Sequence, residues 1–293
     1  MRLKRVAQGI NLLQIGCGQM GSAMLAGMVA SLGRGLTARV VDPQPRQLPQ
    51  DSGLSFYHQL GDLPADYAPD VVVLAVKPQQ VMELLPQLTP YLSAKPVVIS
   101  IAAGITLAQL AQGLGKDSLG HNGLDDAADG VYLVRAMPNL PAVIGQGITA
   151  WCTASPLPPM VQARVEAVLG SMGHSLLVQD EGVMDAVTAI SGSGPAYLFY
   201  LAECLMAAAQ DLGLSAQVAE TLVLHTLAGS GQLLRQRQGD CSAAELRQQV
   251  TSPAGTTAAA LSVLMQSPHG LAELMAAATA DAHHRSIELR GAA

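Results

Sequence analysis

The stretch LLQIGCGQMG, residues 12–21, decides the fold. Its first four residues are a short apolar run that ends at the pattern GxGxxG, and a helical pattern follows over residues 20–32. A strand, a glycine-rich turn and a helix in this order predict the first unit of a dinucleotide-binding sheet, a context that makes an otherwise weak pattern specific. An ordinary glycine turn is the alternative, and both flanking segments speak against it.

Each glycine of this turn has its own physical reason. Gly16 permits the tight turn, Gly18 lets the backbone approach a pyrophosphate, and Gly21 lets the helix pack closely on the strand. The phosphates then lie on the amides at the helix N-terminus. We therefore predict that this loop binds a dinucleotide, with Gln19 and Met20 as further cofactor-binding residues.

Further strand-like segments alternate with helical ones in the first half of the chain. They cover residues 38–41, 71–76, 97–101, 131–136 and 147–152. This alternation predicts a parallel sheet with right-handed crossovers. From about Asp180 the strands stop, and helices are expected over residues 196–212, 216–236, 258–265 and 271–289. The fold class is thus an α/β Rossmann-type domain, residues 1–179, followed by an all-α domain, residues 180–293.

The residue that follows the second strand bears on the choice of cofactor. Asp42 stands where an acidic side chain accepts hydrogen bonds from the adenosine ribose and favours NAD, because it repels a 2′-phosphate. Arg46 could offset this repulsion and admit NADP, whereas Arg39 lies on the strand and can point away. The residues alone leave NAD and NADP open.

Other cofactor contacts are expected where later strands end. Ala75, Val76, Lys77 and Pro78 end a central strand at the carboxyl edge of the sheet, where such folds bind ligands. Pro138 and Asn139 follow another strand in the same kind of place. We predict that these residues line the nicotinamide pocket, although Lys77 could also be an ordinary solvent-exposed lysine.

Composition excludes several classes of protein. The 293 residues are 49% hydrophobic and only 13% charged, which favours a packed oligomer interface. A formal charge of −6 without a basic stripe speaks against nucleic-acid binding. Four cysteines without a CxxC pair indicate a cytoplasmic protein with no structural metal. The start lacks a signal-peptide pattern, and the apolar run 71–76 is too short to span a membrane.

The C-terminal half contains none of the four lysines, so a lysine acid for carbonyl reduction is missing there. A cyclic imine needs less help, because its nitrogen can carry its own proton. Residues 191–195 (SGSGP) and 250–258 (VTSPAGTTA) each place small residues before an apolar helix. Amides at such helix starts suit a carboxylate, and Thr256 and Thr257 could donate to it or to an imine nitrogen. Two ordinary helix caps are the alternative.

Six short segments of the sequence occur in an order that is characteristic of one family. They read GCGQMGSAMLAG, LAVKPQ, SIAAGI, RAMPNLPA, DAVTAISGSGPAY and VTSPAGTTAAAL. Together they resemble the pyrroline-5-carboxylate reductases over almost the whole chain, and the last two are highly specific. The resemblance implies a Rossmann domain and a helical dimerisation domain. It also implies reduction of Δ1-pyrroline-5-carboxylate to L-proline with NADP(H), with NADH as the alternative, by dimers that often form decamers.

The resemblance also assigns roles in the second loop. It makes Thr257 the catalytic residue, as a hydrogen-bond donor to the substrate ring nitrogen. Ser252, Gly255 and Thr256 would bind the substrate carboxylate, largely through backbone amides. One departure stands out: the family shows PGG where this chain has Ala254 in the middle position. Alanine does not easily take a positive φ, so a slightly shifted loop is expected.

Two acidic residues and one long segment are also compared with the family, and two alternative functions remain. Glu181 and Asp185 match acidic positions of the family and are interpreted as structural groups or groups at the edge of the site. Residues 115–130 form a longer segment than the family has, expected as a surface insertion. One rival is another imine or β-hydroxyacid reductase, and the missing helical-domain lysine speaks against the β-hydroxyacid reductase. The other rival is a non-catalytic nucleotide sensor, which would not need a carboxylate site.

Overall fold

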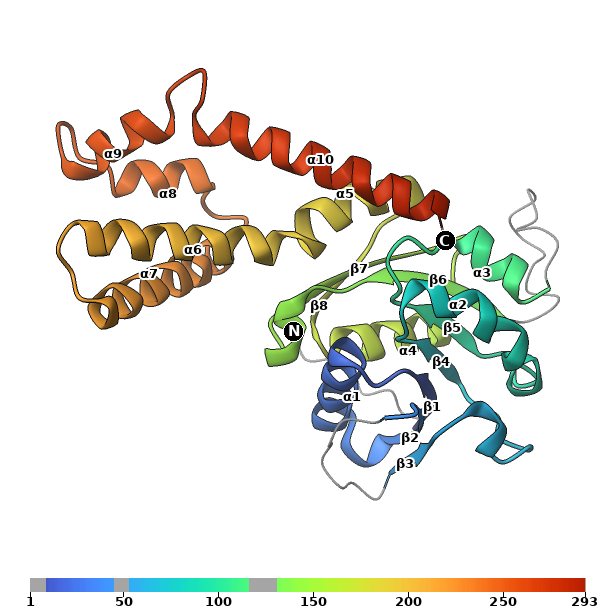
Figure 1. Ribbon diagram of the computed structural model, residues 1–293. Helices are drawn as coiled ribbons and strands as arrows, with labels where there is room; N and C mark the ends of the chain where they lie inside the picture. The colour runs from blue at the N-terminus through green and yellow to red at the C-terminus, as the bar shows by residue number, and fades with distance from the viewer. Residues whose placement is uncertain (1–8, 45–52, 116–130, 293) are drawn as a thin grey trace. The chain divides into compact units, whose positions relative to one another are not determined.

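Strand β1 (Ile10–Ile15) and helix α1 (Gln19–Leu32) flank the glycine-rich turn, as the sequence predicts. The structure, a computed structural model, describes residues 9–44, 53–115 and 131–292 (Figure 1). The chain divides into two units. One comprises Met1–Ser193 with Ala282–Ala293, and the other comprises Gly194–Asp281.

Within the described residues, the first unit holds one eight-stranded sheet. After β1 its strands are β2 (Leu36–Val41), β3 (Leu54–Tyr57), β4 (Val71–Leu74), β5 (Val97–Ser100), β6 (Tyr132–Met137), β7 (Gly147–Thr153) and β8 (Gly173–Leu177). Their order is β3-β2-β1-β4-β5-β6-β7-β8. The chain turns one way from β1 to β2 and the other way to β4, so the carboxyl ends of β1 and β4 form the switch point where such sheets bind ligands.

The predicted parallel sheet contains one antiparallel pair of strands. Strand β7 pairs antiparallel with β6, whereas the other neighbouring strands pair parallel. Only residues 138–146 connect β6 to β7, and a parallel crossover needs a dozen residues or more. The sequence analysis also omitted β3 and β8, the two edge strands, whose side chains are only partly buried.

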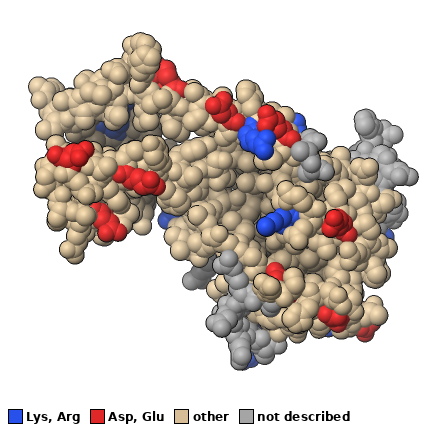
Figure 2. Space-filling view, viewed as in Figure 1, with Lys and Arg blue, Asp and Glu red and all other residues tan. Residues whose placement is uncertain are grey.

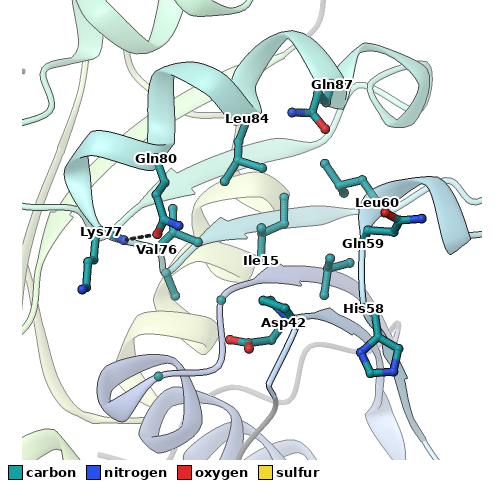
Figure 3. A pocket seen from close by; sticks show the side chains of 15 residues that line it. Ile15, Asp42, His58, Gln59, Leu60, Val76, Lys77, Gln80, Leu84 and Gln87 are labelled. Atoms are coloured by element: carbon teal, nitrogen blue, oxygen red, sulfur yellow. Dashed lines mark hydrogen bonds between the residues drawn. The ribbon is translucent and has the colours of Figure 1, made fainter.

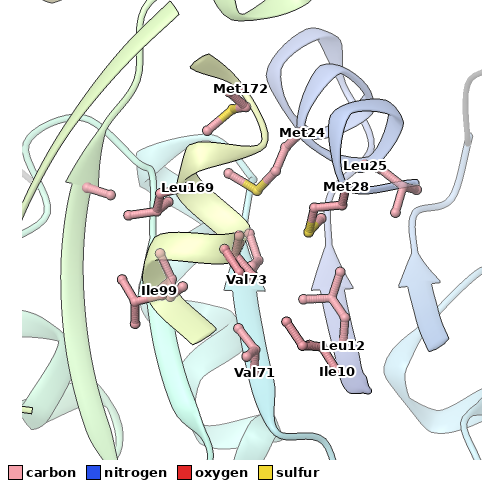
Figure 4. Packing of buried hydrophobic residues seen from close by; sticks show 14 of the residues in the cluster. Ile10, Leu12, Met24, Leu25, Met28, Val71, Val73, Ile99, Leu169 and Met172 are labelled. Carbon is pink, nitrogen blue, oxygen red and sulfur yellow. The ribbon is translucent and has the colours of Figure 1, made fainter. Parts of the chain in front are cut away.

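Helices cover both faces of the sheet. They are α1, α2 (Pro78–Leu84), α3 (Leu107–Gly113) and α4 (Pro159–Gly170). Side chains at alternate strand positions enter two separate hydrophobic clusters. Leu12 and Val73 pack with α1 and α4 on one face, as Figure 4 shows, while Leu13 and Val72 pack with α2 and α3 on the other. Burial on both faces explains why the central strands read as unbroken apolar runs.

The first unit continues past the predicted boundary at residue 179. Residues 181–193 form a short 3₁₀ turn, helix α5 (Met184–Val187) and a π-helical turn (Thr188–Gly192), and Met184 belongs to one of the sheet's hydrophobic clusters. The end of α10 (Leu271–Ala292) also belongs to this unit. The compact units therefore divide at Ser193, and the functional boundary at residue 179 stays a prediction.

A buried charge network explains why these segments belong to the first unit. The buried Asp185 accepts a hydrogen bond from Ser286 (2.7 Å) and forms an ion pair with Arg290 (2.9 Å), and both of these residues lie on α10. Arg135, on β6, pairs with Glu181 at 3.0 Å and approaches Asp185 to 3.9 Å. Glu181 also accepts from the Leu107 amide at 2.9 Å. Glu181 and Asp185 thus have structural roles, one of the two roles that the sequence suggested.

The second unit is helical, as predicted. It contains α6 (Gly194–Asp211), α7 (Ala216–Gln236), α8 (Ala243–Gln249), α9 (Thr256–Leu264) and the first part of α10. All four expected helices are present, α7 has the predicted bounds, and the short α8 was not predicted. Pro195 lies in the first turn of α6, where its fixed φ and missing N–H are tolerated.

Every residue of this second unit is described, and only Pro195, Ala202, Ala219, Val223 and Gly270 are buried. Large apolar side chains such as Leu198, Phe199 and Tyr200 are more than half exposed. Figure 2 shows few charged side chains on the visible face of these helices. An exposed apolar surface of this kind is typical of a protein interface.

The described residues contain neither a membrane-spanning helix nor a metal-binding cluster. None of their helices is long and apolar enough to cross a membrane. They also contain no cluster of three or more His, Cys, Asp or Glu side chains suited to a metal ion.

Asp185→Ala tests the charge network. The substitution leaves the buried Arg135 with one carboxylate fewer and removes both contacts to α10, so the free energy of unfolding should fall by about 3 kcal/mol. Urea denaturation followed by circular dichroism measures it. Glu288→Ala is the control, because Glu288 pairs with Arg285 on an exposed side of the same helix and should matter far less. Equal losses in the two variants would contradict a special role for Asp185.

Candidate functional site

The glycine-rich turn lies at the switch point, and one of its sides packs tightly against the backbone at the end of β4. Gly16 has φ +95°, and a Cβ there would overlap the carbonyl group of Ala75, at the end of β4. Its amide donates to the Val41 carbonyl at 2.9 Å, which ties the turn to β2. A side chain at residue 16 is thus excluded by conformation and by space.

The next glycines leave room on the other side. Gly18 has no atom within 4 Å of an added Cβ, so its backbone is open to a ligand. Helix α1 begins at Gln19, and the first hydrogen bond of its opening turn runs from the Ser22 amide to the Gly18 carbonyl at 2.9 Å. The amides before Ser22 have no carbonyl of this helix to reach, as at every helix N-terminus. Gly21 packs against the Gly16 carbonyl behind the loop.

A cavity of about 400 Å³ opens in front of this turn (Figure 3). Its predicted lining residues are Gly16, Gly18, Asp42, Ala75, Val76 and Lys77. Ile15, Val41, Pro43, His58, Gln59, Leu60, Gln80, Leu84 and Gln87 also line it. The carboxyl ends of β1, β2 and β4 therefore bring together residues that are far apart in the sequence.

The lining residues that the sequence analysis missed come from two elements. His58, Gln59 and Leu60 directly follow β3, the unrecognised edge strand. Gln80, Leu84 and Gln87 follow Lys77 and lie on or just after α2. Their spacing of four and three residues places them along one side of a helix, a signal that was available in the sequence.

Asp42 faces the glycine-rich turn. Its carboxylate accepts a hydrogen bond from the Cys17 amide at 2.6 Å and another from the Gln44 amide at 2.7 Å. These bonds hold a negative charge at the end of β2, where the adenosine ribose lies in folds of this type. Arg46, the residue that could offset this charge, lies outside the described residues.

Arg39 contributes to the fold rather than to the cavity lining. Its guanidinium lies 3.9 Å from the ring centre of Tyr67. Burial raises the pKa of Tyr67 to about 12, and the phenol donates to the Leu12 carbonyl at 2.8 Å. The sequence expectation that Arg39 can point away from the cofactor agrees with this position.

Lys77 and Pro78 begin α2 beside the cavity. Pro78 takes the first helical position, and the Lys77 amide donates to the Gln80 side chain at 3.3 Å, as Figure 3 shows. Lys77 is exposed and lines the cavity, so its position fits both interpretations of the sequence.

Pro138 and Asn139 do not line this cavity. The Asn139 side chain accepts from the Ile148 amide at 2.9 Å and donates to the Ser191 carbonyl at 3.2 Å. It therefore links the β6–β7 hairpin to the π-helical turn. Gly192 in that turn also packs tightly against the Met137 side chain.

The second predicted loop lies in the helical unit, where Thr256 begins α9. Ser252 is exposed, Thr257 is half-buried, and a Cβ on Gly255 would collide with the Ser252 hydroxyl. Ala254 has φ +55°, so the loop takes the left-handed conformation despite the alanine. Alanine thus adopts a positive φ here at a steric cost, and a slight shift of the loop relative to the family stays a prediction.

The predicted insertion at residues 115–130 can be judged only at its first residue. Gly115 follows α3 with φ +73°, a common way to end a helix, and the remainder lies outside the described residues.

Two family models match the chain. Residues 181–289 match pyrroline-5-carboxylate reductase dimerisation, and residues 12–104 match NADP oxidoreductase, coenzyme F420-dependent. Among curated proteins, the pyrroline-5-carboxylate reductase of Pseudomonas aeruginosa is 34% identical, with 94% of this chain and 95% of that protein covered. The Mycobacterium tuberculosis reductase is 36% identical with the same coverage.

Solved structures agree with the sequence relatives. A pyrroline-5-carboxylate reductase from Coxiella burnetii has a TM-score of 0.81 and 31% identity, covering 96% of this chain and 99% of that one. Plasmodium falciparum pyrroline carboxylate reductase with NADP bound has a TM-score of 0.78 and 27% identity, covering 97% and 99%.

Ala254→Gly should stabilise the protein. Glycine takes φ +55° without the steric cost that alanine has, so the free energy of unfolding should rise by about 1 kcal/mol. The greater conformational entropy of glycine in the unfolded chain offsets part of this gain. Thermal and urea unfolding measure the change. Ala258→Gly, inside the first turns of α9, is the matched control and should destabilise the protein. A loss of stability in Ala254→Gly would contradict strain at this residue.

Proposed function

Because the chain belongs to the pyrroline-5-carboxylate reductase family, we infer that it reduces Δ1-pyrroline-5-carboxylate to L-proline with NADP(H), the last step of proline biosynthesis. The observation that carries this conclusion is 34% identity over 94% of the chain. The order of the glycine-rich turn and the SPAGTT loop supports it. Neither a β-hydroxyacid reductase nor a sensor accounts for both features.

The cavity at the switch point supports the proposed binding of the cofactor. A dinucleotide pyrophosphate needs an open backbone, free helix amides and space. Gly18, the start of α1 and a cavity of about 400 Å³ provide them. Gly16, Gly18, Gln19, Met20 and Gly21 would form the phosphate loop. When bound, the nicotinamide cofactor supplies the hydride that reduces the C=N bond.

The remaining cofactor contacts follow from the strand ends. Asp42 would accept hydrogen bonds from the adenosine ribose. Ala75, Val76, Lys77 and Pro78 extend from β4 toward the nicotinamide end, with Pro138 and Asn139 after β6. All six are proposed as contacts of the nicotinamide and not as acids or bases, and of them Ala75, Val76 and Lys77 line the cavity described above.

The substrate would bind at the start of α9. Amides there carry partial positive charge and can hold the substrate carboxylate, with Ser252, Gly255 and Thr256 around it. Thr257 would donate a hydrogen bond to the lone pair that the ring nitrogen gains as hydride adds to the C=N carbon. No lysine acid is required, because the imine nitrogen carries its own proton into the reaction. The protein's contribution is then positioning and anion binding.

The chain forms a homo-oligomer through its dimerisation domain. We assign cofactor binding to residues 1–179, and dimerisation and substrate binding to residues 180–293. This functional boundary nearly coincides with the family match at 181–289 and differs from the structural boundary at Ser193. The apolar side chains exposed on α6 and α7 would supply the interface. Assembly of dimers into a decamer and a cytoplasmic location are further parts of this proposal.

A spectrophotometric assay tests the function. Oxidation of NADPH and of NADH is followed with Δ1-pyrroline-5-carboxylate as acceptor, and turnover is expected with at least one cofactor. Absence of turnover with both would overturn the assignment.

In the same assay, Asp42→Asn should raise kcat/KM for NADPH relative to NADH by about tenfold, because a charge that faces the 2′-phosphate is removed. An unchanged ratio would contradict that role for Asp42.

Thr257→Ala tests the proposed catalytic donor. Loss of one donor to a reacting group should lower kcat by about a hundredfold and leave the KM for the cofactor unchanged. Ser262→Ala is the matched control, because Ser262 is another hydroxyl of α9 whose bond stays within the helix, to the Ala259 carbonyl. Unchanged turnover in Thr257→Ala would remove this residue from its role.

A further inference from the structure

Gln14 is an unusual residue for its position. It lies in β1 between Leu13 and Ile15 and is fully buried, although the neighbouring strand positions are apolar. A buried polar side chain costs free energy unless it forms hydrogen bonds. Its presence two residues before the glycine-rich turn therefore calls for a physical reason.

The bonds of Gln14 supply that reason. Its side-chain amide nitrogen donates to the Gly16 carbonyl at 3.0 Å and to the Gly21 carbonyl at 2.9 Å. One side chain thus links the first and last glycines of the GxGxxG pattern. The carbonyl oxygens define which end of the amide is the nitrogen, since only the NH₂ group can donate two hydrogens.

The Gly16–Cys17 peptide is held from both sides. Gln14 donates to its carbonyl, while Asp42 accepts from its N–H at 2.6 Å. The carbonyl and N–H of a trans peptide point in opposite directions, so two such bonds fix the orientation of the peptide plane. This plane sets the direction in which the backbone enters Gly18 and the first turn of α1.

We propose that Gln14 is a positioning residue for cofactor binding, which orients the phosphate-binding loop by holding the Gly16 and Gly21 carbonyls. This inference rests on the proposed function, because it concerns the same cofactor cavity. With both carbonyls held behind the loop, the amides at the start of α1 remain on the open side. Gln14 itself does not line the cavity and acts only through the backbone.

The other end of the same side chain supports a positional role. Within the described part of the chain, the Gln14 oxygen is buried without a hydrogen-bond partner. An unpaired buried oxygen is unfavourable, so stability alone would favour an apolar residue of the same size. Gly21 is consistent with this geometry, because a Cβ there would lie 3.1 Å from the Gln14 nitrogen and crowd its approach.

Gln14→Met and Gln14→Glu test the proposal in the full-length protein. Methionine keeps the length of the side chain without donors, and glutamate keeps its shape while losing the NH₂ group. Fluorescence titration gives the Kd for NADPH and for NADH, and steady-state kinetics give kcat at saturating concentrations. Val168→Ala, a buried truncation in α4, serves as the control for a general loss of stability.

The Kd of both cofactors should rise by about tenfold or more, because two hydrogen bonds that order the loop are lost. The ratio of the two Kd values should not change, since the loop contacts the pyrophosphate that both cofactors share. The kcat should stay within about threefold, and Val168→Ala should lower the melting temperature without altering either Kd.

The outcomes separate the two proposals. Wild-type protein that binds neither cofactor would overturn the proposed function. Wild-type binding with unchanged Kd values in both Gln14 variants would overturn the role of Gln14 alone. Should neither variant fold, the wild-type protein still decides: the side-chain amide protons of Gln14 should exchange slowly with solvent in NMR spectra recorded without cofactor, and rapid exchange would refute the proposal.

Discussion

The close approach of Gly16 to the end of β4 is the constraint on which the first unit depends. The Ala75 carbonyl occupies the space that a side chain at residue 16 would need, and Gly16 adopts a φ that other residues avoid. This contact brings the carboxyl ends of β1 and β4 together. The cavity, the start of α1 and the carboxylate of Asp42 all take their places around it.

The sequence was most informative where one residue type has one physical purpose. GxGxxG after an apolar run located β1, α1 and the cavity at the switch point, and the helical patterns located α6, α7, α9 and α10. In these segments the local conformational preference and the final packing agree, so reading the sequence locally was sufficient.

Elsewhere, distant contacts decided the outcome. Strand β3 pairs only at one edge and has partly exposed side chains, so it gave no clear apolar pattern, and His58 and Gln59 were missed with it. Residues 181–193 belong with the sheet because Asp185 and Glu181 meet Arg135 and the end of α10. Ala254 keeps a left-handed conformation that its residue type disfavours. No local pattern encodes such partners.

A reaction that needs little acid catalysis places its demands on the backbone. If the substrate imine carries its own proton, the protein must chiefly orient two anionic groups, a pyrophosphate and a carboxylate, and helix N-termini do this with main-chain amides. The side chains that matter most are then those that hold the main chain. Gln14 and Asp42 hold one peptide of the first loop, and Gly255 lets Ser252 approach closely in the second. Such residues are recognised by the backbone atoms that they bind, which is why the buried Gln14 carried no signal in the sequence alone.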